Sequence, residues 1–304
     1  MTAGNITPVP PEPVAETVCA VVITWFPDSS IVQRIARILE QVGSMVIIDN
    51  GSPEEMIALL RGIASSPSVE LLENNENKGV ARALNQAAEI AAQSGAQWML
   101  AFDQDTVVRD GLLESLIAVF RDSSRKAAII GSNYWSTAKQ RRFLGCGRHR
   151  EKGYVERKTV ITSGTLVWLG LLGQIGGFRE DYFIDSVDHE YCLRARANGY
   201  RVLISCAELM SHSIGDDSVS RRRFIAYEHP AIRKYYMTRN TLVTLSTYFS
   251  TEPLWAFCQI IRLVAELVSI IFLESDKRRK ARYYFRGVRD ALAGRMGRVS
   301  GVMR

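Results

Sequence analysis

The sequence lacks the cysteine patterns that mark disulfide-rich and zinc-binding proteins. Its 304 residues include five cysteines, which are scattered and form no C-x-x-C pair. They are Cys19, Cys146, Cys192, Cys206 and Cys258. An odd, scattered set argues against a disulfide framework or a structural zinc site, and favours a reducing cytosol. Cys192 and Cys206 are then most simply core residues.

Two other signatures are missing near the beginning of the chain. Residues 1–17 are rich in proline and have no apolar core of a secretory signal, so we expect a disordered lead-in there. The first apolar run, 19–24, is not followed by G-x-G-x-x-G, which excludes a dinucleotide-binding fingerprint. Nor is it followed by the glycine-rich basic loop that a sugar nucleotidyltransferase would need.

Positive charge is confined to one end of the chain. The formal net charge is +6, but residues 277–304 alone hold ten Lys or Arg and one Asp, which leaves about −3 for the rest. This pattern predicts a basic tail on a mildly acidic body. Because the body is not basic and no aromatic RNA-binding signature is present, we expect no nucleic-acid partner.

What the sequence does contain is an ample apolar core in alternating elements. Apolar residues make up 47% of the chain and charged residues 23%, as in soluble globular proteins. Short apolar runs at 19–24, 45–48, 69–72 and 98–102 read as buried strands, and stretches of helical spacing separate them. This β-α-β-α-β-α-β alternation predicts an α/β fold with a doubly wound, mostly parallel sheet.

Acidic residues follow two of these strands directly. Asp103-Gln104-Asp105-Thr106 ends the fourth strand, and Asp49-Asn-Gly-Ser52 ends the second. Ligands of open α/β sheets bind beyond the carboxyl ends of strands, where two carboxylates can hold Mg²⁺ or Mn²⁺ and thereby a diphosphate. Asp49 can accept from an imide N–H or a ribose hydroxyl of a nucleotide. The alternative in both places is an ordinary polar turn.

The segment before the third helix carries a second candidate anion site. Asn77-Lys-Gly79 opens a helix whose first backbone amides suit an anionic ligand. Asn85 lies in the second turn of that helix and can point toward the same crevice.

Together these motifs resemble those of the family 2 inverting glycosyltransferases, which have the GT-A fold. The resemblance rests on Val22-Ile-Thr-Trp25, Ile48-Asp-Asn-Gly-Ser52, Asn77-Lys-Gly-Val-Ala-Arg-Ala-Leu-Asn85 and Phe102-Asp-Gln-Asp105. In the second half, Ile161-Thr-Ser-Gly-Thr165, Gly176-Gly-Phe-Arg-Glu180, Phe183 to Arg194 and Tyr235-Tyr-Met-Thr-Arg-Asn240 are similar to the rhamnosyltransferase branch. The match spans roughly residues 18–245.

The resemblance implies a domain division and a set of site residues. The GT-A domain would occupy residues 18–248, with a nucleotide-sugar half at 18–108 and an acceptor half at 109–248. Aligned on Cys192-Leu-Arg194, Asp188 falls on the catalytic Asp of the family, with Asp185 or Glu190 as possible helpers. The metal would be held by Asp105, His212 and Asp103. The donor would be bound by Thr24, Asp49, Asn77, Gly79, Asn85, Asp103 and Arg239.

Each of these residues also has an ordinary structural interpretation. Acidic residues are common at any helix start, such as the one near Asp188. A lone histidine such as His212 is more often a satisfied loop or core residue. Arg233 and Arg239-Asn240 lie on an expected helix near the site, and can equally form its solvated face.

The reaction that the resemblance implies is a single displacement with inversion. We expect transfer of L-rhamnose from dTDP-L-rhamnose to a hydroxyl of a lipid-linked saccharide or a glycolipid, with the choice of thymine or uracil nucleotide open. The alternatives are another donor sugar, a haloacid-dehalogenase-like phosphatase built on Asp103-Gln-Asp-Thr106 and Asp216-Asp217, and a non-catalytic, membrane-tethered binding module.

Residues 249–304 predict a separate helical tail. Leu254 to Leu273 is long and apolar enough for a membrane span, but Gln259, Arg262, Glu266 and Ser269 form a polar stripe. A buried Arg and Glu disfavour a span, so an in-plane amphipathic helix fits better. The cluster that begins at Lys277 attracts anionic phospholipids. We therefore expect a cytoplasmic enzyme, peripheral on the inner face of the membrane; the alternative is a helix pair packed on the body.

Overall fold

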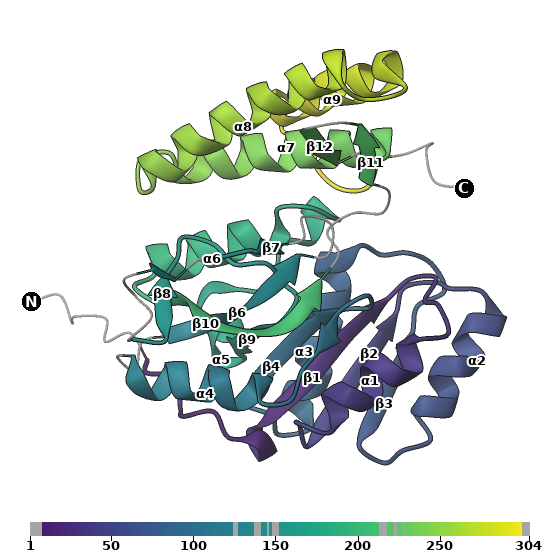
Figure 1. Ribbon diagram of the computed structural model, residues 1–304, viewed down its shortest axis with the longest axis vertical. Coiled ribbons are helices and arrows are strands. Elements are labelled where there is room, and N and C mark those ends of the chain that lie inside the picture. Colours follow the sequence, from purple (N-terminus) through teal and green to yellow (C-terminus); the bar gives the residue numbers. More distant parts are fainter. Residues whose placement is uncertain are drawn as a thin grey trace, which may run out of the picture.

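The fold is described from a computed structural model of the chain (Figure 1). The structure describes residues 8–123, 127–136, 141–144, 146–147, 152–212, 218–221, 224–227 and 229–299. The strands are β1 Val18–Thr24, β2 Ser44–Asp49, β3 Val69–Glu73, β4 Trp98–Asp103, β5 Val107–Val108, β6 Ala127–Ser136, β7 Arg141–Arg142, β8 Tyr154–Glu156, β9 Thr165–Trp168, β10 Arg201–His212, β11 Ser218–Arg221 and β12 Phe224–Tyr227. The helices are α1 Ile31–Leu39, α2 Glu54–Ile63, α3 Val80–Gln93, α4 Leu112–Asp122, α5 Gly170–Ile175, α6 Val187–Ala197, α7 Ala231–Tyr248, α8 Pro253–Phe272 and α9 Lys277–Leu292, with short 3-10 turns η1 Ala15–Thr17 and η3 Glu180–Tyr182.

The central sheet has the order β3-β2-β1-β4-β9-β6-β10-β5. The first four of these strands are parallel, as the alternating pattern predicts. Beyond β4 the sheet is mixed, because β9 runs antiparallel to both β4 and β6, whereas β10 is parallel to β6. The predicted α/β class with a mostly parallel sheet is confirmed.

Helices cover the sheet on both faces, so its strands carry apolar residues on both sides. Along β1, Val18, Ala20 and Val22 belong to the core that α1, α2 and α4 complete. Cys19 and Val21 belong to the opposite core, which α3, α5 and α6 complete. Burial on two faces explains why these strands are continuous apolar runs rather than alternating ones.

The register brings the predicted site segments to one edge of the sheet. Thr24 lies opposite Asp49, and Ile23 lies opposite Asp103. Farther along, Val107 of β5 pairs with Ser211 of β10, one residue before His212. The chain just after Asp105 therefore runs beside the end of β10.

The chain before β1 is partly ordered, so the predicted disordered lead-in is wrong for residues 8–17. Pro10 and Pro13 are buried, and the carbonyl of Pro11 accepts from the indole of Trp98 at 3.2 Å. Proline-rich composition suggested disorder, but prolines without free N–H groups can pack on a body without leaving unpaired donors.

A disulfide joins Cys146 to Cys206, with the Cα atoms 5.9 Å apart. This corrects the expectation of no disulfides, and Cys206 is only half-buried rather than a core residue. The pairing of β6 with β10 causes the encounter: Asn133 donates to the carbonyl of Leu144 at 3.0 Å and to that of Cys206 at 3.5 Å. The spacing of cysteines along the sequence does not predict that Cys146 and Cys206 lie close together. Cys192 is buried as predicted, and burial raises its thiol pKa to about 12.

Three C-terminal helices form a layer beyond α6, at the top of Figure 1. α7 and α9 pack closely, because a Cβ on Gly287 would lie 2.7 Å from the carbonyl oxygen of Tyr235. Lys234, Glu274 and Lys280 form a buried ion network between the helices. α8 is long and apolar enough to cross a membrane by length and composition.

Candidate active site

The acidic turn after β4 is tied to the segment that precedes β9. The Asp103 N–H donates to Ser163 Oγ at 3.3 Å, and that oxygen lies 2.5 Å from Thr106 Oγ1. Asp103 is partly exposed and Asp105 is exposed. Both carboxylates therefore stand at the carboxyl edge of the sheet, where the sequence predicts a cation and a diphosphate.

Two of the three carboxylates near the start of α6 are committed to protein partners. Glu190 is buried, and it accepts from Arg194 at 2.8 Å and from the Tyr248 hydroxyl at 2.9 Å. Asp185 is paired with Arg233 at 2.9 Å. Because both carboxylates already accept from protein donors, they have less capacity to receive an acceptor hydroxyl than a carboxylate without such partners.

Asp188 is the third carboxylate, and its surroundings differ. Within the described part of the chain, the hydrogen bond to its side chain comes from the N–H of His189, at 2.8 Å, at the N-terminus of α6. Asp188 also lines a cavity of about 20 Å³ together with Thr162 and with Ala101 of β4. Thr162 precedes Ser163, and Ala101 lies two residues before Asp103. Asp188 therefore lies near residues that adjoin the acidic turn, and its place in one site with Asp103 and Asp105 stays a prediction.

The loop that leads into α6 is strained. Phe183, Asp185 and Ser186 have positive φ values of 66°, 65° and 60°. Such conformations cost free energy in residues other than glycine, and they persist only where the surroundings enforce them. Asn240 of α7 does this, because its amide lies within 3.0 Å of the carbonyl oxygens of Tyr182, Ile184 and Asp185.

Arg239 supports the same loop, and its predicted contact with the donor stays a prediction. Its guanidinium is fully buried, and all five of its N–H donors are used. The acceptors are the carbonyl oxygens of Asp181, Tyr182 and Gly297, the hydroxyl of Tyr235 and the side chain of Asn240. A donor could bond to this guanidinium only by displacing one of these acceptors.

Arg233 lies between the two acidic segments. The Asp185 carboxylate raises the pKa of Arg233, against the effect of burial, and Asp103 adds to this. The guanidinium stays charged and side-chain exposure is 37%. Arg233 is therefore a cation that interacts electrostatically with both the loop before α6 and the acidic turn after β4.

Thr24 and Asp49 are fully buried and contact each other. Asp49 Oδ1 accepts from the hydroxyls of Thr24 at 3.0 Å and Ser52 at 2.6 Å, while Oδ2 accepts from the N–H groups of Gly51 and Ser52. These bonds use the acceptor capacity of the carboxylate and shape the turn after β2. A nucleotide base could bond to Asp49 only by displacing one of them, so the donor contact of both residues stays a prediction.

The start of α3 contacts protein, and the predicted contacts of Gly79 and Asn85 with the donor stay predictions. The Val80 N–H donates to the carbonyl of Phe183 at 2.7 Å, and a Cβ on Gly79 would lie 2.5 Å from that oxygen. Asn85 is buried and holds both the N–H and the C=O of Phe178. Gly79 and Asn85 therefore position the segment before α6.

Asn77 has a local role at the same place. Its side-chain oxygen accepts from the N–H of Gly79 at 2.9 Å and from the amide of Asn50 at 3.3 Å. These bonds join the turn after β2 to the start of α3. Its contact with the donor stays a prediction.

The acidic turn fits a divalent cation by the chemistry of its donors. Asp103 and Asp105 supply carboxylate oxygens, which Mg²⁺ and Mn²⁺ accept. Among the residues that the structure describes, no group of three or more His, Cys, Asp or Glu side chains gathers at one point. The backbone of His212 ends β10 beside β5, but its side chain lies outside the described atoms.

Sequence reasoning missed an aromatic pair at the mouth of the site. Trp25 and Phe26 follow β1 directly and are 47% and 49% exposed, with ring centroids 5.1 Å apart. Gln104, between the two aspartates, holds Trp25 by bonds to its N–H at 2.8 Å and its C=O at 3.0 Å. The signal available in the sequence was a pair of aromatic residues directly after an apolar strand.

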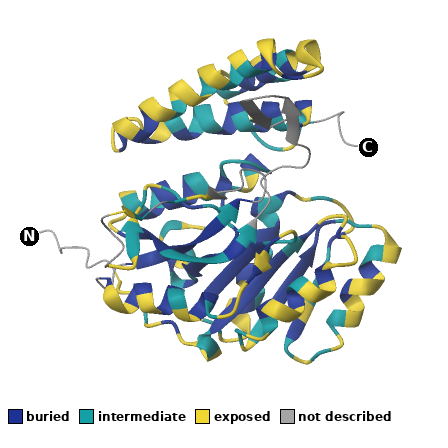
Figure 2. Ribbon diagram, in the orientation of Figure 1, coloured by how far each residue is buried: buried dark blue, intermediate teal, exposed yellow. Residues whose placement is uncertain are grey.

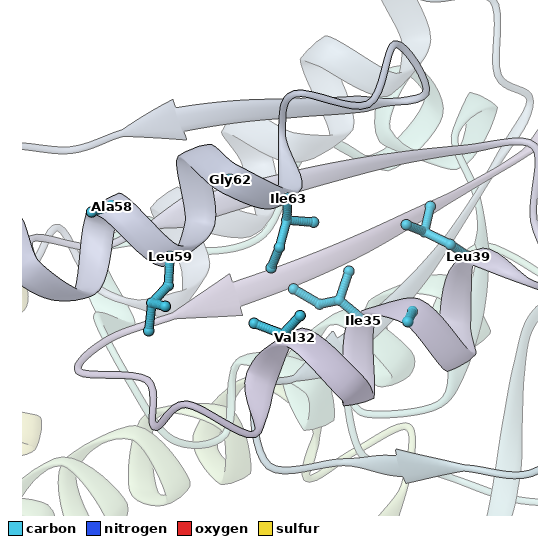
Figure 3. Close-up of a pocket in the computed structure, with 8 residues that line it drawn as sticks. Val32, Ile35, Leu39, Ala58, Leu59, Gly62 and Ile63 are labelled. Carbon is cyan, nitrogen blue, oxygen red and sulfur yellow. The ribbon is translucent and has the colours of Figure 1, made fainter.

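A larger hollow lies elsewhere, between α1 and α2. Figure 3 shows its apolar lining, which includes Val32, Ile35 and Leu59, and its volume is about 420 Å³. No polar or titratable side chain lines it. It therefore offers no side chain for proton transfer or for binding a cation.

Comparisons with known proteins agree with this geometry. The model of the family described as glycosyl transferase family 2 matches residues 19–173. The dTDP-rhamnosyl transferase RfbF of Shigella flexneri is 27% identical over 294 residues, which cover 93% of this chain and 96% of that relative.

Two solved structures show the same fold. The mannosyltransferase PcManGT from Pyrobaculum calidifontis, in complex with GDP-Man and Mn²⁺, has a TM-score of 0.58 at 14% identity, over 94% of this chain and 91% of that one. S. aureus TarS, in complex with UDP-GlcNAc, has a TM-score of 0.61 at 12% identity, over 91% and 80%. The predicted GT-A fold is confirmed.

The family also decides between the alternatives. A phosphatase built on the Asp103 motif and a non-catalytic binding module both disagree with the family match and with the arrangement around Asp188. The predicted resemblance, including its rhamnosyltransferase-like character, is confirmed. This chain belongs to glycosyl transferase family 2, and the protein is a glycosyltransferase.

Proposed function

We propose that this enzyme transfers L-rhamnose from dTDP-L-rhamnose to a hydroxyl of a lipid-linked saccharide or glycolipid, with inversion at the anomeric carbon. The similarity to a dTDP-rhamnosyl transferase over nearly the whole of both chains supports this donor. The observation that carries the mechanism is that Asp188 has no cationic partner among the described residues, whereas its neighbours Asp185 and Glu190 do.

Asp188 acts as the general base in this proposal. Its carboxylate takes the proton from the acceptor hydroxyl as that oxygen attacks the anomeric carbon. The bond between the anomeric carbon and the diphosphate oxygen breaks at the same time, and dTDP leaves. Attack from the face opposite the leaving group inverts the configuration.

Asp103 and Asp105 would hold the divalent cation, with His212 as a third ligand. When bound, the cation neutralises charge on the departing diphosphate. The mannosyltransferase structure with GDP-Man and Mn²⁺ supports a cation in this fold. Arg233 adds a fixed positive charge near Asp103.

The nucleotide binds at the carboxyl ends of β1 and β2 in this proposal. Asp49 accepts from the imide of the base, at the cost of one of its present bonds. The exposed ring of Trp25 offers a face on which the base can stack. Because the acceptor is lipid-linked, we place the enzyme in the cytoplasm, on the inner face of an anionic membrane.

Release of nucleoside diphosphate tests the proposal. Purified enzyme is incubated with dTDP-L-rhamnose and, in parallel, with UDP- and GDP-sugars, with Mn²⁺, with Mg²⁺ or with a chelator. We expect release from dTDP-L-rhamnose that depends on the cation. Asp188→Asn should lower transfer to an acceptor at least about 100-fold without changing donor affinity.

The controls separate the donor from the mechanism. Release from a UDP- or GDP-sugar but not from dTDP-L-rhamnose would show that the donor is wrong. An Asp188→Asn variant with the wild-type transfer rate would show that the base is wrong. Transfer unchanged by chelation would exclude the cation.

A further inference from the structure

α8 turns its apolar side outward and much of its polar side toward the protein, which is the reverse of a helix that packs on a soluble protein. Its large outward side chains are apolar and between 39% and 79% exposed. They are Leu254, Phe257, Ile260, Ile261, Val264, Val268, Ile271 and Phe272. Figure 2 shows this exposure along the outer edge of the C-terminal layer. We call these residues the apolar face of α8.

Much of the predicted polar stripe points the other way. Glu266 forms an ion pair with Lys234 of α7, and Ser269 Oγ lies 3.3 Å from Glu274 Oε1. Gln259 is also partly buried, whereas Arg262 stays exposed. α8 is thus amphipathic, but Gln259, Glu266 and Ser269 are only partly exposed, and Glu266 and Ser269 contact other residues of the protein.

Buried charges fix this orientation. Lys234 is fully buried, and its ammonium lies 2.7 Å from Glu274, which also forms an ion pair with Lys280 at 3.0 Å. Rotating α8 to turn its apolar face inward would break the pair of Glu266 with Lys234. Leaving a buried charge without its partner is strongly unfavourable, so the apolar face stays outward.

α9 adds a second exposed stripe, which contains basic residues. Arg278, Arg282, Phe285, Arg289 and Leu292 are all exposed and recur at helical spacing. Phe285 is 56% and Leu292 83% exposed. Arginine side chains interleaved with apolar ones can place their stems in an apolar layer and their charges at its polar boundary.

We propose that the apolar face of α8 and the exposed stripe of α9 dock in the plane of a bilayer that contains anionic phospholipids. The charge of α9 complements phosphate head groups, whereas a second copy of this chain would bring further positive charge to the same face. The helix does not span the bilayer, because its inner side remains bonded to α7 and to Glu274. This inference deepens the proposed function and rests on its lipid-linked acceptor.

The docking face is also joined to the catalytic loop through a single helix. α7 binds α8 through Lys234, and five residues later Arg239 and Asn240 hold the loop before Asp188. A bilayer on α8 therefore has a fixed position relative to the candidate base. That arrangement suits an acceptor whose reactive hydroxyl lies near the membrane surface.

Vesicle co-sedimentation of the full chain tests the docking face. The vesicles consist of phosphatidylcholine alone or of an equimolar mixture with phosphatidylglycerol. The combined variant Phe257→Ser, Ile261→Ser and Val264→Ser should lower the partition coefficient at least about tenfold on the mixed vesicles. Arg278→Gln with Arg282→Gln should lower it only where phosphatidylglycerol is present, and added salt should have the same effect.

A matched control removes exposed apolar residues from a different surface. Val32→Ser with Leu59→Ser changes side chains that are 41% and 38% exposed in the hollow between α1 and α2, and should leave vesicle binding unchanged. Light scattering in solution gives the oligomeric state of each variant. Donor hydrolysis without lipid, which uses residues far from this face in sequence, should persist in all of them.

The outcomes separate this inference from the proposed function. Wild-type protein that stays off the mixed vesicles, or an α8 variant that binds them like the wild type, overturns the docking face. So does a wild-type dimer that the α8 substitutions convert to a monomer without loss of vesicle binding. Absence of hydrolysis of dTDP-L-rhamnose by wild-type enzyme contradicts the proposed donor and leaves the vesicle result standing.

Discussion

Glu190 lies two residues after Asp188 in α6, yet its contacts give it a structural role. It joins α6 to α7 through Tyr248, and it pairs with Arg194 four residues along its own helix. Burial, and then the Glu190 carboxylate, raise the pKa of Tyr248, so the phenol stays protonated and donates. Proximity in sequence therefore does not make the two carboxylates equivalent.

Glu190→Gln should reduce stability rather than chemistry. The neutral amide weakens the bonds to a buried tyrosine and to Arg194, so the free energy of unfolding should fall by about 1–3 kcal/mol. Urea unfolding measures that loss, and initial transfer rates at a temperature well below the transition should remain near the wild-type value. If the stable variant loses transfer as completely as Asp188→Asn, Glu190 has a part in the chemistry.

Arg239→Lys should affect both stability and turnover. A lysine cannot reach five acceptors, so carbonyls of the loop before α6 lose their donors and the free energy of unfolding should fall by about 3 kcal/mol. Because the loop places Asp188, kcat should fall while the affinity for dTDP-L-rhamnose is retained. Arg295→Lys, on an arginine that is 66% exposed, is the matched control. A variant that binds the donor weakly but turns over normally would contradict this role.

The residue scale also shows why sequence reasoning did not predict the burial of Arg239. α7 buries Lys234, Thr238, Arg239, Asn240 and Thr244, which are polar residues that a helical pattern assigns to solvent. Arg239 and Asn240 are held there by loop carbonyls of residues more than fifty positions away. Asp188, by contrast, was assigned through the resemblance of its segment to a family motif. Residues that act through distant backbone groups leave no local signal.

At the scale of elements, the first half of the sheet was predictable and the second was not. β1, β2 and β4 are apolar runs because helices cover both faces of a parallel sheet. β10 is different: its pairing with β6 has register shifts, and polar side chains such as Glu208 interrupt its apolar pattern. Irregular pairing of this kind is fixed by distant segments, so periodicity alone could not predict it.

The start of α3 provides a prediction at this scale, with two glycines of equal φ. Gly79 and Gly95 both have a φ of 86°, but a Cβ at Gly79 would lie 2.5 Å from the Phe183 carbonyl, whereas Gly95 has open space around it. Gly95→Ala should cost about 1–2 kcal/mol, which is the penalty of a left-handed conformation. Gly79→Ala should cost at least about 3 kcal/mol and also lower kcat, because it displaces the loop before α6.

Chemical denaturation and initial rates of both variants check this difference. Gly79 has a ψ of 160°, in a region that essentially only glycine adopts, so part of its larger loss of stability comes from the backbone, and the fall in kcat is the readout of the contact with Phe183. Equal losses of stability, with equal kcat values, would show that the close approach of α3 to Phe183 has no role in placing the base.

At the scale of the whole molecule, the C-terminal segment is not an appendage to the catalytic body. The N–H of Gly297 donates to the carbonyl of Asp181 at 2.7 Å, and Arg298 pairs with Glu76 at 2.8 Å. The N–H of Val299 donates to the Tyr236 hydroxyl at 2.9 Å. Residues 297–299 therefore contact both the loop before α6 and the loop before α3. The predicted tail at 249–304 carries part of the support for the site.

Two truncations test this contribution at neighbouring positions. Removing residues 300–304 keeps every contact of Gly297, Arg298 and Val299, so transfer and the melting temperature should stay near wild type. Removing residues 297–304 takes a donor from Asp181 and an acceptor from Arg239, which frees the strained loop on one side. We expect kcat to fall at least about tenfold, because small displacements of a catalytic group are costly. Vesicle binding, which depends on α8, should persist in both truncations. A loss confined to transfer then places the defect at the loop before α6. Wild-type turnover of the chain without residues 297–304 would refute this role of the C-terminal segment.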